Sequence, residues 1–403
     1  MTPSATKPEG NSSGRVRSWT GPAILSYGYR PFFLLAGVWA ALAMGAWVAM
    51  LAGLNPIATH FAPVDWHAHE MLFGFLGAVL AGFLLTAVPN WTGRMPIIGW
   101  PLSALVSLWV VGRIAIAVSN GLPAVMVAVL DLSFLTALAA VIGREILSGQ
   151  NWRNLPLLMM LILFIVANGL FHFELARGGY AAGGYGFRTG LAVAVMLVTL
   201  IGGRIVPSFT RNWLAKRKSD HLPTPFGMFD RIVMVATLVA LIAWVVLPWH
   251  SVTAFLCAIG CIGNLIRLGR WSGLRTGAEP LLWILHIGYL FVPLGFLAVA
   301  LSLLGNGISP AIGAQHVWMA GAVGIMPLAM MTRASLGHSG RPLTATRTIT
   351  AVYYLVIASV VLRFIASFGA APDWVLDLST TGWIAGFAGF SIVYWPILTK
   401  PRK

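Results

Sequence analysis

The chain has 403 residues, of which 58% are hydrophobic and only 9% are charged, and its mean hydropathy is +0.83. Soluble globular domains carry about 25% charged residues, so this composition excludes a soluble globule with a charged surface and predicts a polytopic membrane protein. The formal net charge of +15 does not indicate a nucleic-acid partner, because the lysines and arginines lie mainly in the breaks between apolar segments.

Twelve apolar segments divide the chain, and a membrane-spanning helix needs about 20 mostly apolar residues. We therefore expect an all-α fold with a twelve-helix membrane domain at residues 31–398. Residues 1–30 are polar and basic and show no removable signal peptide, so they are predicted to form a cytoplasmic tail. The predicted spans run roughly from 31 to 53, 66 to 89, 100 to 118, 121 to 142, 154 to 176, 188 to 206, 227 to 248, 250 to 266, 280 to 304, 312 to 335, 347 to 369 and 377 to 398.

Positive charge is concentrated in every second turn of this predicted topology. The opposite side carries only Arg177 and Arg188. Lysine and arginine are retained on the cytoplasmic side of membrane proteins, so both termini are predicted to be cytoplasmic. The basic side includes Arg94, Arg144, Arg153, Arg204, Arg211, Lys216, Arg231, Arg267, Arg333 and Lys400.

An internal repeat relates the second and tenth segments. His69 and His316 are each followed by glycine five residues later, at Gly74 and Gly321, and by a Gly-Arg pair at equal distance. Proline also opens the first, fifth and ninth segments at a spacing of about 124 residues. A repeat used three times predicts three four-helix units around a pseudo-threefold axis, at about 31–153, 154–278 and 279–398.

Four histidines are predicted at one depth near the outer face: His67, His69, His172 and His316. We expect a shared heme or metal there rather than four structural histidines, since ionisable groups within a membrane are costly. His67 and His69 point about 200° apart on a helix and cannot both bind one iron axially. The repeat pairs His69 with His316 at one heme and leaves His67 and His172 for a second heme or a copper. His286 is a further candidate ligand, toward the cytoplasm.

Two arginines, Arg113 and Arg363, lie within apolar segments of equivalent repeat units. A buried guanidinium needs a partner, and heme propionates offer bidentate pairing. The alternative partners are Asp131, Asp373 or backbone carbonyls.

Two acidic residues, Asp65 and Glu70, flank the outer histidines. They are expected to orient imidazoles or to pass protons. Together with His67 they are the candidate catalytic residues.

Twelve helices with histidines on the second and tenth resemble the catalytic subunit of the heme-copper oxidases, in which these two helices supply heme ligands. The copper-binding histidines that the oxidases place on helices six and seven are missing here. An oxidase-type binuclear centre is therefore not expected.

Longer strings of sequence resemble the NnrS family of bacterial inner-membrane proteins. They include Gly28 to Phe33, Asp65 to Gly74, Ala81 to Gly93, Gly203 to Asn212, and His316 to Arg341. The resemblance implies a heme-containing protein of the bacterial inner membrane that is linked to nitric oxide, with heme b at one or two sites and copper as a further option.

The sequence favours an enzyme that reduces or detoxifies nitric oxide with electrons from membrane quinol. One alternative is a non-catalytic heme or copper protein that binds nitric oxide or handles metal-nitrosyl species. A second alternative is a secondary transporter, although a threefold period is not the usual arrangement of transporter repeats. The expected partners are nitric oxide, quinol and the lipid bilayer.

Overall fold

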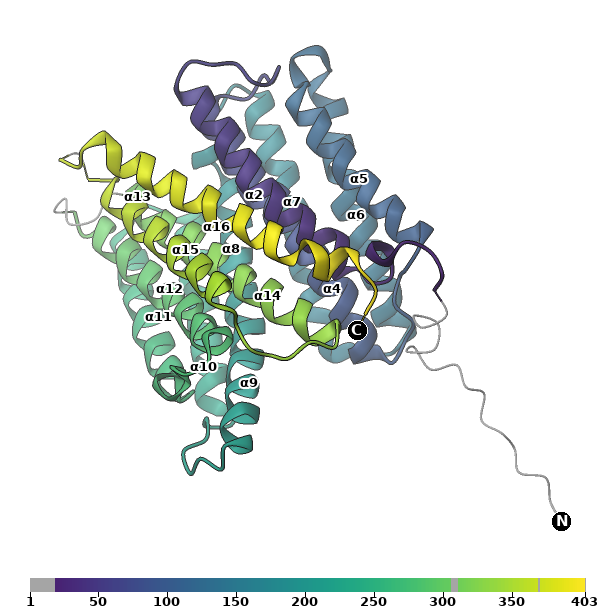
Figure 1. The fold of residues 1–403 in the computed structure, drawn as a ribbon. Helices are drawn as coiled ribbons and strands as arrows, with labels where there is room; N and C mark the ends of the chain where they lie inside the picture. Colours follow the sequence, from purple (N-terminus) through teal and green to yellow (C-terminus); the bar gives the residue numbers. More distant parts are fainter. Residues whose placement is uncertain (1–18, 306–310, 369, 403) are drawn as a thin grey trace.

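The computed structural model describes residues 19–305, 311–368 and 370–402. Within these ranges the chain forms no strand, and twelve helices are long and apolar enough to cross a membrane, which confirms the all-α twelve-span prediction (Figure 1). Of the predicted cytoplasmic tail, residues 1–18 lie outside the described part, whereas Tyr29 and Arg30 already begin the first membrane helix. The C-terminal Lys403 also lies outside it.

Nine spans are single helices and three are interrupted. The single ones are α2 (Tyr29–Leu51), α5 (Trp100–Ala117), α6 (Ala124–Ser148), α7 (Leu155–Ala176), α10 (Met228–Val246), α11 (Ser251–Gly269), α12 (Pro280–Leu303), α15 (Arg347–Ile365) and α16 (Asp373–Thr399), all within the described ranges. The interrupted ones are α3 (Pro63–His69), η2 (Glu70–Phe75) and α4 (Leu76–Thr92); α8 (Tyr185–Leu197), η6 (Val198–Gly202) and α9 (Gly203–Lys216); and α13 (Ala311–His316), η8 (Val317–Ile325) and α14 (Met326–His338).

The three interruptions are π-helical segments, at η2, η6 and η8. They occur in the second, sixth and tenth spans, which are the three that the predicted repeat makes equivalent. Segments η2 and η8 begin directly after His69 and His316 respectively. Since π-helical turns are rare and occur mostly at functional sites, their positions draw attention to the second and tenth spans.

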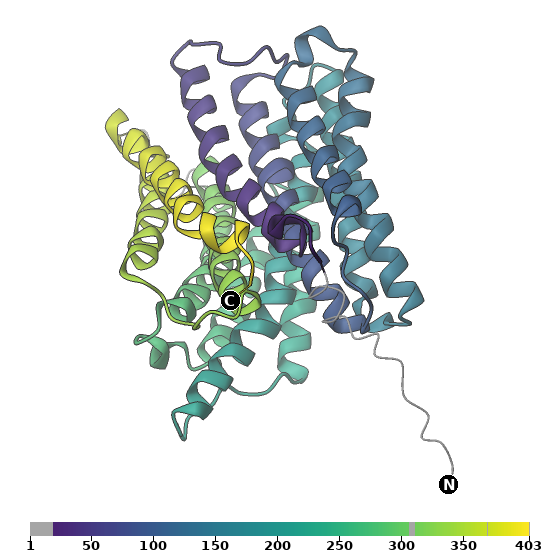
Figure 2. The same cartoon turned by 45° about the vertical axis from the view of Figure 1, so that its right-hand side comes forward.

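The helix contacts can be compared with the predicted four-helix units. The last helix of one unit packs on the first helix of the next, as α6 on α7, α11 on α12, and α16 on α2. Helices α2 and α16 come from opposite ends of the chain and lie side by side (Figure 2). Arg30 joins them by donating hydrogen bonds to the carbonyl oxygens of Leu398 and Lys400, at 3.1 and 2.6 Å.

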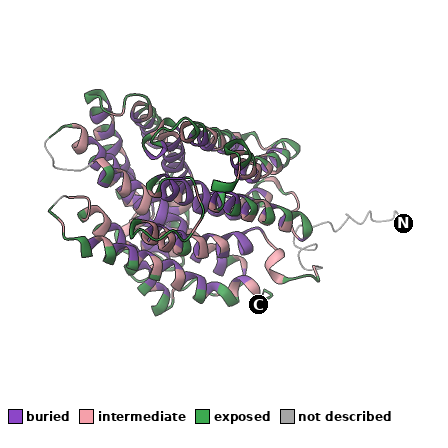
Figure 3. Ribbon diagram, turned by 90° about the horizontal axis from the view of Figure 1, so that it is seen from above, coloured by how far each residue is buried: buried purple, intermediate pink, exposed green. Residues whose placement is uncertain are grey.

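The interrupted spans form the interior, and most of their residues are buried, as are those of α12 (Figure 3). A narrow apolar cavity lies between them, lined among others by Leu76 of α4, Ala194 of α8 and Met326 of α14. The single helices other than α12 form the periphery and expose large apolar side chains, which suits a lipid-facing surface. These features support the threefold arrangement, which stays a prediction.

Candidate functional site

The polar residues near the N-terminal end of the second span form two separate groups. We call the first the charged cluster: His69, Glu70, Arg113, Asp131, Asn168 and His172. We call the second the histidine cavity, which contains His67, His316 and Arg363 among its lining residues. The two groups lie on different faces of the same span.

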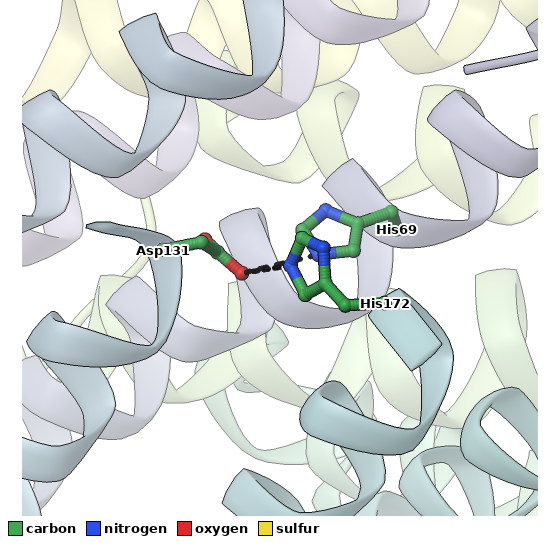
Figure 4. Close-up of side chains that lie close together, drawn as sticks. All are labelled: His69, Asp131 and His172. Carbon is green, nitrogen blue, oxygen red and sulfur yellow. Dashed lines mark hydrogen bonds and ion pairs between the residues drawn. The ribbon is translucent and has the colours of Figure 1, made fainter. Parts of the chain in front are cut away.

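Asp131 of α6 is the centre of the charged cluster. Its Oδ2 lies 3.1 Å from Nε2 of His172 and 3.2 Å from Nε2 of His69, and it accepts a hydrogen bond from Nδ2 of Asn168 at 2.7 Å (Figure 4). His69, His172 and Asp131 each offer one ligand atom within 4.8 Å of the others. Two imidazoles and one carboxylate are an ordinary donor set for a divalent transition metal, so these three residues are a candidate metal site.

Arg113 of α5 binds both carboxylates of the cluster. Its Nη1 donates to Oε1 of Glu70 and its Nη2 to Oδ1 of Asp131. The guanidinium is therefore paired with protein carboxylates, which was the alternative to heme propionates in the sequence analysis. Because a buried pair is strongly destabilised when one partner is removed, the three residues must be considered as one unit.

The formal charge of the cluster does not cancel. One guanidinium and two carboxylates leave one negative charge before either histidine is counted. All three ionised side chains are buried, and an uncompensated charge in a membrane interior is costly. The cluster thus has a place for one further positive charge, which a protonated histidine or a bound metal cation would supply.

Aromatic rings surround His69 and keep the cluster dry. Phe61, Phe73 and Phe171 have ring centroids 5.7, 5.3 and 5.3 Å from that of the imidazole. Both ring nitrogens of His69 are engaged, Nδ1 with Glu70 at 3.0 Å and Nε2 with Asn168 at 3.0 Å. His69 is consequently held in a fixed orientation by the protein itself.

The histidine cavity lies among α2, the second span, α8, the tenth span, α15 and α16. It encloses about 640 Å³ of empty space including its open mouth, of which only about 50 Å³ is wide enough for the centre of a water molecule. The cavity is therefore narrow, and we refer to it as the slot. Its lining is mostly apolar, with Met44, Met71 and Met319 beside the polar residues.

The two histidines of the cavity have ring nitrogens that the protein does not use. His67 stacks on Trp47 with ring centroids 4.2 Å apart, and its buried Nδ1 has no hydrogen-bond partner among the described residues. In His316, Nδ1 lies 2.7 Å from the carbonyl oxygen of Ile312 and must donate to it, because a carbonyl only accepts. This hydrogen bond leaves Nε2 of His316 as a free ligand atom, as is usual for metal-binding histidines.

The structure corrects the expected pairing of the histidines. His67 and His69 do face different groups, as their spacing predicted, but His316 shares a cavity with His67 and not with His69. His172 belongs with His69 instead. The repeat placed His69 and His316 at equivalent positions along their helices, which does not fix the direction in which each side chain points.

Three predicted site residues remain. Arg363 belongs to the histidine cavity, whereas Asp65 and His286 lie outside both groups. Arg363 lines the histidine cavity and donates to Oγ of Ser367 at 2.9 Å. Asp65 accepts a hydrogen bond from the backbone of Ala182 at 2.7 Å and so fastens the loop segment η5 (Ala181–Gly183) to the second span. His286 pairs with Thr210 at 2.9 Å, away from the other candidate ligands.

Two participants were not singled out in the sequence. Asn168 bridges His69 and Asp131, and Trp47 stacks on His67. Asn168 precedes His172 by one helical turn in an otherwise apolar segment, and that spacing places both on one helix face. This signal was available in the sequence, whereas nothing in the sequence distinguished Trp47 from the other tryptophans.

Comparison with known proteins identifies the family. No curated protein matches the chain. The family model described as NnrS protein matches residues 23–402, a range that contains all twelve described spans and both polar groups. The chain therefore belongs to the NnrS family and is a multi-pass membrane protein of that family.

Proposed function

We propose that this protein acts on nitric oxide at a heme held in the histidine cavity, as an enzyme of the bacterial inner membrane with cytoplasmic termini. The observation that carries the proposal is the meeting of His67 and His316 in one narrow, mostly apolar slot, each with a ring nitrogen that has no hydrogen-bond partner among the described residues. The link to nitric oxide comes from the family. Nitric oxide is small and apolar, so it reaches such a slot through the bilayer.

The residues present fit a heme. The unpartnered, buried Nδ1 of His67 shows that this imidazole is not satisfied by the protein alone, and an unsatisfied buried polar group is costly. His67 and His316 would bind the iron, and Arg363, on the wall of the same slot, would pair with a propionate. A bound heme would supply an iron that binds nitric oxide and transfers electrons to it.

The charged cluster would supply protons. Reduction of two nitric oxide molecules to nitrous oxide and water consumes two electrons and two protons. Glu70 follows His67 by three residues, and its Oε2 is buried without a hydrogen-bond partner in the described part of the chain. A carboxylate oxygen with a free lone pair can hold a proton close to the slot. Membrane quinol is the proposed electron donor.

A second candidate function is binding of nitric oxide without turnover. Two histidines in one slot favour it, because an iron bound by both would have no open axial position. The three methionines of the slot favour a related variant in which copper binds there, since thioether sulfur and imidazole are ligands of Cu(I). Both variants use the same residues as the enzyme.

Absorption spectra of the purified protein, oxidised, reduced and after addition of nitric oxide, test the proposal. We expect a heme Soret band that shifts with nitric oxide, and consumption of nitric oxide when a quinol is supplied. His67→Ala and His316→Ala should each remove the band, whereas His172→Ala should keep it. Full heme content in both cavity variants would refute the assignment of the slot, and bound nitric oxide without consumption would favour the non-catalytic function.

Metal analysis of the same samples tests the charged cluster. If a cation occupies it, about one copper or other transition metal per chain should be lost from the His172→Ala and Asp131→Asn variants while heme is retained. If metal content is unchanged in these variants, the extra positive charge of the cluster is a proton on histidine.

A further inference from the structure

A basic pocket lies at the end of the molecule that the lysine and arginine distribution predicts to be cytoplasmic, where α9 projects in Figure 1. It has a volume of about 720 Å³ and is bordered by η4 (Trp152–Asn154), which directly precedes α7, by α9, by the loop at 223–226 and by the start of α10. Four arginines line it: Arg153, Arg204, Arg211 and Arg231.

These four arginines are not neutralised by the protein. The one carboxylate at the pocket, Asp230, lies 3.1 Å from Nε of Arg267 and 3.6 Å from Nη1 of Arg270, two arginines outside the lining. Among the described residues, none of the four forms an ion pair with a carboxylate. The pocket therefore concentrates uncompensated positive charge and attracts an anion.

An apolar groove lies on the same three spans that border the basic pocket. It has a volume of about 700 Å³ between α7, α8 and α10, and its lining includes Pro156, Met160, Met196 and Leu241. Pro156 is only three residues from Arg153 on the same span. On the sixth span, Met196 and Gly203 are seven residues apart, or about 10 Å along a helix, which is a separation that a glycerol backbone with its ester groups can bridge.

We propose that this groove and pocket together bind one anionic phospholipid, with its phosphate among the four arginines and an acyl chain between α7, α8 and α10. Arginine binds phosphate through charge-assisted bidentate hydrogen bonds, and basic pockets between membrane helices are typical sites for anionic head groups. A free phosphate would leave the groove uncovered, and a neutral quinone would leave the arginines without counter-ions. The lipid would fasten α7 to α8 and α10 within the second four-helix unit, because the groove lies between these three helices.

The test uses the full chain in detergent. Thermal stability of the unaltered protein is measured with added phosphatidylglycerol, phosphatidylcholine or inorganic phosphate, and co-purified lipid is identified by mass spectrometry. We expect phosphatidylglycerol to raise the melting temperature and the other two additives to have little effect. Equal stabilisation by inorganic phosphate would show a free-anion site, and equal stabilisation by phosphatidylcholine would show a groove that does not select charge; either result overturns the proposal.

Paired variants locate the site. Arg204→Gln with Arg211→Gln should reduce phosphatidylglycerol retention roughly tenfold or more, since each arginine near an anionic head group contributes appreciably to binding. The matched control is Lys216→Gln with Lys218→Gln, which removes the same charge from exposed positions on the same side without touching the pocket. Equal losses in both pairs would mean that the arginines act only through general surface charge, which would refute the site. Ala192→Trp, which fills the groove, should lower retention without changing the charge.

Discussion

The two faces of the second span hold histidines in opposite states. His69, in the charged cluster, has both ring nitrogens engaged and is fully buried by its neighbours. His67, two residues earlier, lines a slot and has a buried nitrogen with no partner among the described residues. The difference indicates two roles. A histidine whose ring nitrogens are both hydrogen-bonded maintains structure and charge, whereas one with a buried nitrogen that has no partner is available to a ligand.

The comparison also explains why the two groups lie so close together. Reduction of a ligand in the slot changes its charge, and a charge in a medium of low dielectric constant acts strongly on its neighbours. Glu70 contacts His69 and Arg113 through Oε1, and its Oε2 has no hydrogen-bond partner among the described residues, so this carboxylate can respond to such a change by taking up a proton. On the proposed function, the second span would connect the ligand site in the slot to the proton-carrying groups of the charged cluster.

Removal of the central carboxylate should have the largest effect. Asp131→Asn leaves Arg113 with one of its two carboxylates and replaces a charged acceptor of both cluster histidines with a neutral amide, so stability should fall by about 3–5 kcal/mol. Thermal unfolding in detergent measures this loss. Asp377→Asn, at an exposed position of α16, is the control and should change little. A small effect of Asp131→Asn would mean that the charged cluster does not stabilise the fold.

The close packing around Gly74 should give the next largest effect. A Cβ at this position would lie 2.7 Å from Nη1 of Arg113 and 2.9 Å from Oε2 of Glu70. Gly74→Ala therefore forces the ion pairs apart, and overpacking of this kind costs about 1–3 kcal/mol. The control is Gly77→Ala, one turn away, whose Cβ would lie 3.6 Å from Cδ2 of Leu135, an ordinary van der Waals contact, so this change should be tolerated.

A change at Trp47 tests whether the slot holds His67 in a fixed orientation. Trp47→Leu removes the ring that stacks on His67, an interaction of about 0.5–1.5 kcal/mol. We expect a shifted Soret band and weaker ligand retention with an intact charged cluster, measured by spectra and by thermal unfolding of the same sample. Trp395→Leu, at an exposed position of α16, is the control. An unchanged spectrum in the Trp47 variant would mean that stacking does not orient His67.

Much of the fold could be predicted from the sequence, because spanning helices are set by local apolar length. All twelve predicted spans overlap an observed helix, but several helices extend further, most of all the sixth, at Tyr185–Lys216, and also the second and the fourth, at Pro63–Thr92 and Ala124–Ser148. Their polar ends remain helical beyond the apolar stretch on which the prediction relied. The π-helical segments have no such local signal, and they were not predicted.

The candidate site was predicted less well than the fold. Depth and spacing correctly separated His67 from His69, since helix geometry alone fixes that angle. The residues that contact each histidine depend on how helices distant in sequence are rotated about their axes. Asp131, for example, reaches His69 from α6, and His316 lies at the slot directly before η8. Periodicity within one segment carries no information on that rotation.

The smallest expected effect concerns Asp65, for which the sequence suggested catalysis and the structure shows a hydrogen bond to the loop at Ala182. Asp65→Asn keeps an acceptor oxygen but cannot exchange a proton, so stability should fall by less than about 1 kcal/mol and nitric oxide consumption should stay within about twofold of the unaltered protein. Glu70→Gln is the matched isosteric change on the same span, and consumption there should fall at least about tenfold if Glu70 delivers protons. Equal losses in both variants would place Asp65 on the proton path and extend the functional region to the outer loop.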